Sequence, residues 1–195
     1  MNLSLDKAEL RKTILSQRKN LSLTIKQQAS ERIVQTILES PFYSSAKHIG
    51  LYFAFQGEVD LQTLMLRAWH TEKKTYFPVV QENKTLLFFE VSSTTPLKPN
   101  RFGIPEPVVT HPSVSLEILD NLFIPLVAFD DERYRLGMGQ GYYDRTLAPL
   151  YAQDQITQVK TIGIGYAFQH TAALPREPWD IPLDMIITER YIWKG

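Results

Sequence analysis

Apolar side chains recur three or four positions apart in several parts of the chain, which is the spacing of one face of an amphipathic helix. The first such pattern follows Asp6, and Glu9 three positions later completes a pair that resembles a capping box. The second begins after Ser22 and is stopped by Pro41, because proline breaks or kinks a helix. We predict helices over Asp6–Arg18, from Ser22 to the residue before Pro41, over Asp60–His70 and over Tyr142–Tyr151.

Short runs of apolar and aromatic side chains separate these helices, and such runs are typical of buried strands. Pro125 lies within one of the runs and suggests a sheet edge or a bulge there. The proline-rich segment Ser92–Ser113 is predicted to be mostly loop. The predicted strands are His48–Phe55, Thr75–Val80, Leu86–Val91, Asn121–Phe129, Val159–Phe168 and a last one that begins at Met185 and runs to Thr188.

The order of helices and strands predicts a three-layer α/β/α fold, with helices on both faces of an open sheet that is mostly parallel or mixed. No linker divides the pattern, so we expect a single domain over residues 1–195. A chain of this length buries most of its apolar surface and needs no disulfide or metal to hold its core.

The composition mainly removes candidate functions. The chain has no cysteine, which excludes a thiol nucleophile, a thiolate zinc site and an iron–sulfur cluster. Its 21 basic and 21 acidic side chains balance, so we expect neither a general nucleic-acid partner nor an anionic membrane. No signal peptide or membrane-spanning run is visible in the sequence. We therefore expect a cytoplasmic protein, with a monomer as the default.

The glycines are unevenly spread, because three of the nine lie within five residues at Gly137, Gly139 and Gly141. Alternating glycines let backbone amides converge on an anion at the start of a helix. Arg135 can add a bidentate phosphate contact, and Asp144 is well placed to hold Mg²⁺ beside phosphates. The spacing matches neither the dinucleotide fingerprint nor the P-loop. The alternative is a plain glycine-rich turn, but the flanking arginine and aspartate favour a phosphate site.

The glycine segment and its flanking residues resemble a known protein family. The segment Arg-Leu-Gly-Met-Gly-Gln-Gly-Tyr-Tyr-Asp-Arg, residues 135–145, resembles the signature of 5-formyltetrahydrofolate cyclo-ligases, also called methenyltetrahydrofolate synthetases. The similarity extends over essentially the whole chain, and the glycine segment is its most specific part. The other matching segments are Lys7–Arg11, Gln56–Asp60, Phe102–Pro107, Leu122–Val127, Ile162–Tyr166 and Asp180–Asp184.

The resemblance implies an ATP- and Mg²⁺-dependent enzyme that converts 5-formyltetrahydrofolate, with or without a polyglutamate tail, to 5,10-methenyltetrahydrofolate. In that reaction the formyl oxygen is phosphorylated, N10 closes the ring, and ADP and phosphate are released. The protein then mainly positions the substrates and stabilises the charge on the transferring phosphoryl group.

The resemblance also implies roles for individual residues. The catalytic residues would be Arg135, Tyr143 and Asp144. The ATP site would use Lys7, Arg11, Arg135, Gly137, Met138, Gly139, Gln140, Gly141, Tyr142 and Tyr143. The folate site would use Phe53, Glu58, Phe102, Met138, Gly139, Gln140, Gly141 and Tyr142. The magnesium carboxylates would be Asp144 and Asp184.

Several of these residues have ordinary alternatives. Lys7 and Arg11 lie one turn apart, so without the resemblance they would be a solvated helix face. Glu58 alone would be a loop carboxylate, and Phe53 alone would be a core aromatic. Phe102 would be a hydrophobic contact under a proline-rich loop.

Two rival functions also stay open at this level. A sugar-phosphate isomerase or an acyl-carrier transferase could use the same phosphate cradle on a similar scaffold, since fold does not determine function. Such a site would need no paired magnesium carboxylates. A folate or nucleotide binder without catalytic activity is the other alternative, and the joint presence of Arg135, Asp144 and Glu58 disfavours it.

Overall fold

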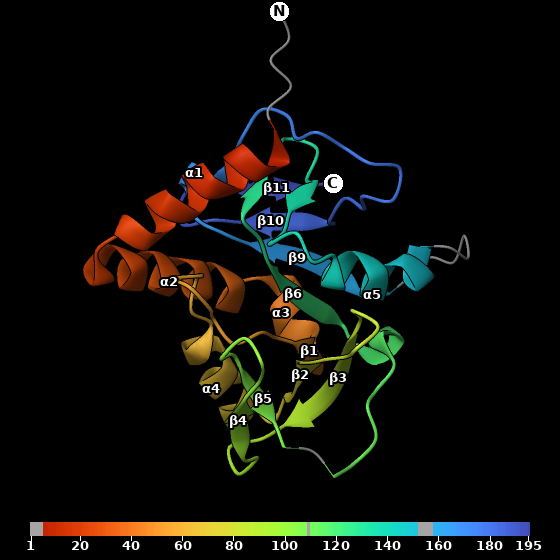
Figure 1. Cartoon of the computed structure of the whole chain (residues 1–195). Helices are drawn as coiled ribbons and strands as arrows, with labels where there is room; N and C mark the ends of the chain where they lie inside the picture. Colours follow the sequence, from red (N-terminus) through yellow and green to blue (C-terminus); the bar gives the residue numbers. More distant parts are fainter. Residues whose placement is uncertain (1–5, 109, 152–157) are drawn as a thin grey trace, which may run out of the picture.

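A seven-stranded sheet in the order β11-β10-β9-β6-β1-β2-β3 forms the centre of the fold (Figure 1). The computed structural model describes residues 6–108, 110–151 and 158–195. The sheet strands are β1 (His48–Gly50), β2 (Lys74–Val80), β3 (Leu86–Val91), β6 (Asn121–Pro125), β9 (Lys160–Ile164), β10 (Met185–Ile187) and β11 (Ile192–Lys194). The inner neighbours are parallel, whereas the outer pairs β2–β3 and β10–β11 are antiparallel. This mixed sheet confirms the predicted fold class.

Helices cover both faces of the sheet, with α2 and α4 on one side and α5 on the other (Figure 1). Alternation along the strands supplies both cores, because Phe123 of β6 packs toward α2 while its neighbours Leu122 and Ile124 pack toward α5. The helices are α1 (Lys7–Asn20), α2 (Leu23–Leu38), α3 (Pro41–Ser45), α4 (Gln62–His70) and α5 (Tyr142–Tyr151).

The helix starts follow the polar residues that the sequence marks. The Asp6 side chain accepts a hydrogen bond from the backbone N–H of Ala8, and Ser22 caps α2 through the N–H of Ile25. Pro41 does not simply end α2, which stops at Leu38, but opens the short helix α3. Among the described residues, no helix is long and apolar enough to cross a bilayer.

Three predicted strands are too long. The run His48–Phe55 is strand only to Gly50, because the chain then leaves the sheet for a turn in which Gln56 and Gly57 both have positive φ. An apolar run that lines a cavity reads like a buried strand in the sequence. Likewise the run Val159–Phe168 ends as strand at Ile164 and continues into a 3-10 turn at Ala167–Gln169.

The run Asn121–Phe129 is divided in two at the position that Pro125 marks. Strand β6 ends at Pro125, and β7 (Ala128–Phe129) belongs to a separate two-stranded sheet with β8 (Arg135–Leu136). The proline-rich segment Ser92–Ser113 is not wholly loop, since it contains a hairpin of β4 (Leu97–Pro99) and β5 (Pro105–Pro107). Side-chain alternation is too short in these strands to predict them from sequence.

The connections around the sheet run in two directions from its centre. From β1 the chain passes through α4 to β2, and from β6 it passes through α5 to β9 on the other side. Strands β1 and β6 are parallel neighbours. The gap between their carboxyl ends is therefore a topological switch point, which is where ligands bind in open α/β sheets.

Candidate active site

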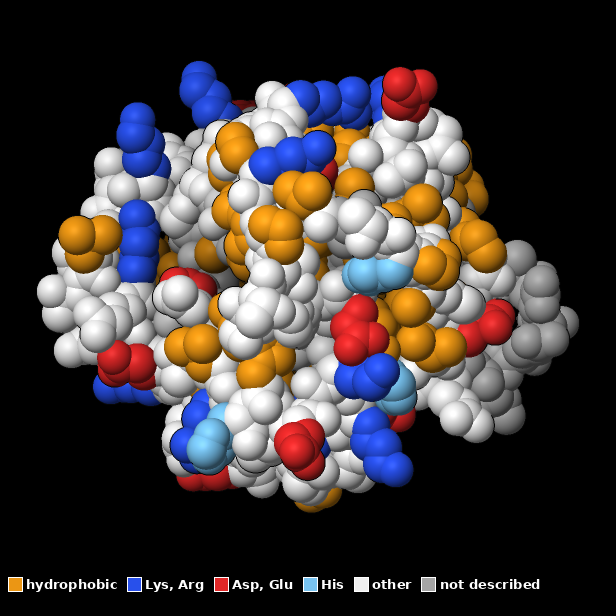
Figure 2. Space-filling view, turned by 90° about the horizontal axis from the view of Figure 1, so that it is seen from below, with side chains coloured by type: hydrophobic (Ala, Val, Ile, Leu, Met, Phe, Trp, Pro, Cys, Tyr) orange, Lys and Arg blue, Asp and Glu red, His pale blue; other side chains and the backbone are white. Residues whose placement is uncertain are grey.

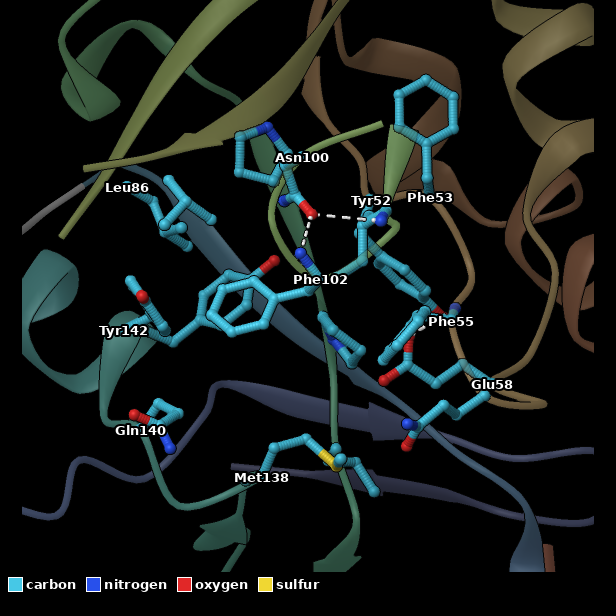
Figure 3. A pocket seen from close by; sticks show the side chains of 18 of the residues that line it. Tyr52, Phe53, Phe55, Glu58, Leu86, Asn100, Phe102, Met138, Gln140 and Tyr142 are labelled. Carbon is cyan, nitrogen blue, oxygen red and sulfur yellow. Dashed lines mark hydrogen bonds between the residues drawn. The ribbon is translucent and has the colours of Figure 1, made fainter. Parts of the chain in front are cut away.

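A cavity of about 480 Å³ lies at this switch point. Its walls come from residues 52–58 after β1, residues 100–106 of the β4–β5 hairpin, residues 125–127 after β6 and residues 135–144. Figure 3 shows Glu58 and Phe55 on one side of the cavity and Tyr142 and Gln140 on the other. A cavity of this size with aromatic walls and a few polar groups is typical of a small-molecule site.

Aromatic rings form two walls of this cavity. Phe53 stacks on Phe77 with ring centroids 4.2 Å apart, so it belongs both to the core and to the cavity. Phe102 is 42% exposed and meets the ring of Tyr142 edge-on at 6.3 Å. The Arg101 guanidinium donates a hydrogen bond of 2.6 Å to the Tyr142 hydroxyl. Flat apolar faces of this kind suit a planar heterocycle.

Asn100 holds the turn that presents Phe102. Its Oδ1 accepts hydrogen bonds from the backbone N–H groups of Phe102 and Ile104, at 2.8 and 3.1 Å. Its Nδ2 donates to Oε1 of the buried Glu106, which also accepts from the N–H of Val80. This network ties the hairpin to Val80 at the end of β2 and so positions one aromatic wall of the cavity.

Glu58 brings a buried carboxylate to the opposite wall. Its Oε2 accepts a hydrogen bond of 3.0 Å from the N–H of Phe55, and its Oε1 lies 3.9 Å from Nη2 of Arg18. Burial raises the pKa of Glu58 to about 7, although Arg18 and the Phe55 N–H both act to lower it. A carboxylate in this position can accept hydrogen bonds from N–H donors of a ligand.

The glycine segment, residues 137–141, lies between β8 and α5. Gly139 and Gly141 have φ values of 93° and 69°, a backbone region that favours glycine. The segment ends where α5 begins, with the N–H of Arg145 bonded to the carbonyl of Gly141. Free N–H groups and the helix dipole at such a start favour an anion.

Three arginines surround the glycine segment. Arg135 is 3% exposed, and its Nη2 donates to Oδ1 of Asp144 at 2.7 Å. Its Nη1 is buried and has no hydrogen-bond partner among the described residues. Nε of Arg11 donates to the carbonyl of Gly137 at 2.8 Å, and Nη1 of Arg145 donates to the carbonyl of Gln140 at 2.7 Å. This concentration of positive charge beside a helix start fits a polyphosphate.

Most of the residues that the sequence nominates come together here. Those that line the cavity are Phe53, Glu58, Phe102, Arg135, Gly137, Met138, Gln140, Gly141, Tyr142, Tyr143 and Asp144. Arg11 reaches the cavity wall through Gly137 and lies about 3.5 Å from the position that a Cβ of Gly139 would occupy. Lys7 does not line the cavity, since its Nζ pairs with Oδ2 of Asp180 at 3.0 Å.

Asp184 is not brought beside Asp144. It directly precedes β10, and its Oδ2 accepts hydrogen bonds from the N–H and the hydroxyl of Thr161 at the start of β9. The starts of these parallel strands lie at the opposite edge of the sheet from the cavity. Over residues 6–108, 110–151 and 158–195 no group of three or more His, Asp or Glu side chains forms a metal site. The carboxylate that lies at the cavity wall beside the glycine segment is that of Asp144.

Arg18, Asn100 and Glu106 contribute to the site without being nominated by the sequence. Arg18 is one of several basic residues on α1. Nothing in the sequence of that helix distinguishes it from the basic residues that face solvent. Asn100 lies before a glycine in a proline-rich stretch, where asparagine commonly shapes turns. That signal was present and could have located the turn, though not its contact with the cavity.

The comparisons with known proteins agree on one family. Residues 4–189 match the family model of the 5-formyltetrahydrofolate cyclo-ligase family. A 5-formyltetrahydrofolate cyclo-ligase of Haemophilus influenzae is 39% identical over 178 residues, which are 90% of this chain and 93% of that protein. The cyclo-ligase of Escherichia coli K12 is 34% identical over 186 residues, which are 93% of this chain and 99% of that protein.

Solved structures give the same result. The NMR structure of the Aquifex aeolicus 5,10-methenyltetrahydrofolate synthetase superposes with a TM-score of 0.82 at 37% identity, covering 96% of this chain and 92% of that one. The Mycoplasma pneumoniae 5,10-methenyltetrahydrofolate synthetase has a TM-score of 0.75 at 28% identity, covering 95% and 100%.

Proposed function

The chain belongs to the 5-formyltetrahydrofolate cyclo-ligase family, and from that premise we propose that it converts 5-formyltetrahydrofolate to 5,10-methenyltetrahydrofolate at the expense of MgATP. ADP and phosphate would be the other products. Because the chain belongs to this family of enzymes, we no longer consider the isomerase, the transferase or the non-catalytic binder as its function. The observation that carries the detailed proposal is that a single cavity joins an aromatic, carboxylate-bearing wall to a glycine segment lined with arginine.

The glycine segment would hold the phosphates of ATP. The buried Nη1 of Arg135 has no partner among the described residues, so a phosphate oxygen would satisfy it. The positive φ of Gly139 and Gly141 supports close approach of the backbone to those oxygens. Arg11 lies against the same segment and would add a second cation, with Lys7 released from Asp180 as a third.

The aromatic side of the cavity would hold the folate. Glu58 would accept hydrogen bonds from the N–H edge of the pterin ring, and Phe53 and Phe102 would cover the ring faces. Met138, Gln140 and Tyr142 line the cavity between the two halves and would contact both substrates. The formyl group would then face the glycine segment.

The proposed chemistry is phosphoryl transfer followed by ring closure. The formyl oxygen attacks the γ-phosphorus, and ADP leaves. N10 then attacks the formyl carbon and gives up its proton, and the carbon–oxygen bond breaks to release phosphate, which can carry that proton away. A formamide oxygen is otherwise a poor leaving group. In this scheme Arg135 stabilises charge on the transferring phosphoryl group, while Tyr143 lies beside it with its ring 5.9 Å from the Arg135 guanidinium.

Asp144 would be the protein ligand of Mg²⁺. It is one third exposed at the start of α5 and lies at the cavity wall. A single carboxylate fits this ion, since Mg²⁺ in nucleotide sites commonly takes one or two carboxylates together with phosphate oxygens and water. Bound there, the ion would neutralise developing charge on the phosphates. Asp184 has no part in this arrangement.

We extend the proposal to the state of the protein. Residues 1–195 would form one cyclo-ligase domain that acts as a cytoplasmic monomer on folates with or without a polyglutamate tail. The face shown in Figure 2 carries acidic and basic side chains interspersed with small hydrophobic groups, with no extended field of one sign on its described residues. This mixture gives no support to a nucleic-acid or membrane partner on this face.

One assay tests the reaction. The pure protein is incubated with 5-formyltetrahydrofolate and MgATP, and the near-ultraviolet absorbance of the methenyl product is followed. We expect a rise that requires both ATP and Mg²⁺ and that is matched by phosphate release. No ATP-dependent rise would refute the proposed function. Size-exclusion chromatography with light scattering checks the monomer.

A further inference from the structure

Arg18 is a buried cation that none of the roles above uses. It lies on α1 and is 1% exposed, although most side chains of that helix face solvent. Its Nε donates to the carbonyl of Gln56 at 3.2 Å, and its Nη1 donates to the carbonyl of Leu126 at 3.3 Å. A buried guanidinium is costly unless it is paired, so its position calls for a reason.

The side-chain hydrogen bonds and the ion pair of Arg18 all reach the cavity wall. Gln56 and Leu126 line the cavity, from the turn after β1 and from the end of β6 respectively. The remaining nitrogen, Nη2, has no hydrogen-bond partner among the described residues and lies 3.9 Å from Oε1 of Glu58. Among the described residues, Arg18 is the ion-pair partner of Glu58.

We infer that Arg18 is a positioning residue for substrate recognition, which places a positive charge beside the Glu58 carboxylate and fixes the turn that carries it against the end of β6. This inference rests on the proposed role of Glu58 in binding the pterin ring. Arg18 itself contacts no substrate in this scheme. Its hydrogen bonds to two backbone carbonyls hold the turn in place. The positive charge of its guanidinium comes nearest to Glu58 at Nη2.

The surroundings of Glu58 make that charge necessary. Burial in the cavity wall opposes ionisation, and Arg18 is the first of the two groups that favour it. Among the described residues, three phenols also lie near Glu58 and supply no cation: Tyr52 after β1, Tyr143 on α5 and Tyr166 after β9. Asp60, two positions along the chain, is itself an acid. Lys26 of α2 approaches the neighbouring Gly57 rather than the carboxylate.

The expected consequence is a pH-dependent loss of folate binding when the cation is removed. In Arg18→Gln the pKa of Glu58 rises further, so at neutral pH the group is largely protonated and loses acceptor strength. We expect the KM for 5-formyltetrahydrofolate to rise about fivefold at pH 7 and to recover toward the wild-type value as the pH approaches 9, since a rise of about one unit from a pKa of about 7 lowers the ionised fraction at pH 7 from about one half to about one eleventh. The KM for ATP should stay within about twofold.

Arg18→Lys is the matched control, because it keeps the charge while it loses the planar fork. Its folate KM is expected to keep the pH profile of the wild-type protein. A rise in folate KM that is the same at every pH in Arg18→Gln would overturn the inference, because it would indicate packing alone. An equal rise in the KM for ATP would do the same.

Two measurements keep the inference testable without turnover. Carbon-13 NMR of the glutamate carboxyls in the free protein, with Glu58 identified from Glu58→Gln, should show its titration shifted upward in Arg18→Gln but not in Arg18→Lys. This readout separates failure of the inference from failure of the proposed reaction. If Arg18→Gln does not fold, the double variant Arg18→Gln/Glu58→Gln should regain stability in urea unfolding. A double variant that is equally unstable would count against the pairing.

Discussion

Nη2 of Arg135 donates a 2.7 Å hydrogen bond to Oδ1 of Asp144 across the start of α5. The cation proposed for the phosphates and the carboxylate proposed for Mg²⁺ are therefore already joined before either substrate arrives. Arg135 is almost fully buried in this pair, whereas Asp144 keeps a third of its side chain accessible. Such a pair is pre-organised, because neither side chain has to change its position during the reaction.

Replacing Arg135 should weaken the nucleotide site. In Arg135→Ala a phosphate oxygen loses its partner, and hydrogen bonds to charged groups contribute about 1.5–3 kcal/mol each. We expect the KM for ATP to rise by roughly tenfold to 100-fold, measured by initial rates at saturating folate. Arg190, which is largely exposed away from the cavity, supplies the control Arg190→Ala. Unchanged ATP affinity in Arg135→Ala would exclude the proposed phosphate contact.

Replacing Asp144 should remove activity and the response to Mg²⁺ together. Asp144→Asn keeps an oxygen to accept the bond from Arg135 but loses the charge that binds a cation. Loss of a group that organises transition-state charge commonly costs about 100-fold or more in rate. Activity is measured as a function of Mg²⁺ concentration, with circular dichroism as the check on folding. A variant that stays fully active would show that the metal role is wrong.

Asp184 gives the opposite expectation. Its Oδ2 accepts two hydrogen bonds from the buried Thr161, so Asp184→Ala leaves a buried backbone N–H without a partner. We expect the free energy of unfolding to fall by about 2 kcal/mol, with the Mg²⁺ dependence of the remaining activity unchanged. Urea unfolding and a Mg²⁺ titration measure the two effects. A weakened Mg²⁺ response at full stability would restore Asp184 as a metal ligand.

The turn held by Asn100 should matter for folate and not for ATP. Asn100→Ala removes the acceptor of two backbone N–H groups and the donor to Glu106, so Phe102 loses its fixed position. We expect the KM for 5-formyltetrahydrofolate to rise about tenfold, which corresponds to about 1.4 kcal/mol, while the KM for ATP is unchanged. Phe102→Ala should give a similar shift by removing the ring itself. Equal effects on both substrates would point to a general loosening of the hairpin.

The buried Glu58 also makes stability depend on pH. Its pKa is raised from the usual 4.5 to about 7 in the folded protein. Between these two pH values the folded state therefore holds a proton that the unfolded state has already released. The stabilising contribution is present below about pH 4.5 and is lost as the pH rises through 7. Glu58→Gln should therefore stabilise the protein at pH 8 by up to a few kcal/mol and have little effect near pH 4.5. Urea unfolding at the two pH values checks the sign, and a larger gain at the lower pH would contradict it.

The sequence predicts the elements better than their lengths. Helical periodicity and capping residues located α1, α2 and α5 closely, because local patterns govern where helices begin. The strand predictions extend past Gly50, Pro125 and Ile164. Apolar side chains that line the cavity after Gly50 and Pro125, and the buried Tyr166 after Ile164, look like those of a buried strand. The β4–β5 hairpin and β11 have three-residue strands, which are too short to leave a pattern.

The residues of the candidate site also differ in how far the sequence predicts them. Arg135, the three glycines and Asp144 are close together in the chain, so their pattern could be found in the sequence. Phe53 and Glu58 are far from Phe102 and from the glycine segment in the chain. The family resemblance nominates all three, and the structure brings them to the same cavity as that segment. Their roles stay predictions. Arg18 could not be found, because only the docking of α1 against the ends of β1 and β6 makes this arginine different from its solvated neighbours.

The contacts of α1 also bear on how the protein is made. Arg18 bonds to Leu126, Arg11 to Gly137 and Lys7 to Asp180, across 108, 126 and 173 positions of the chain. Because synthesis runs from the N-terminus, α1 is made well before these three partners. A nascent chain that has not yet reached residue 180 holds its glycine segment without the complete set of contacts from α1. The proposed nucleotide site is therefore expected to be fully assembled only after the chain has been made as far as Asp180.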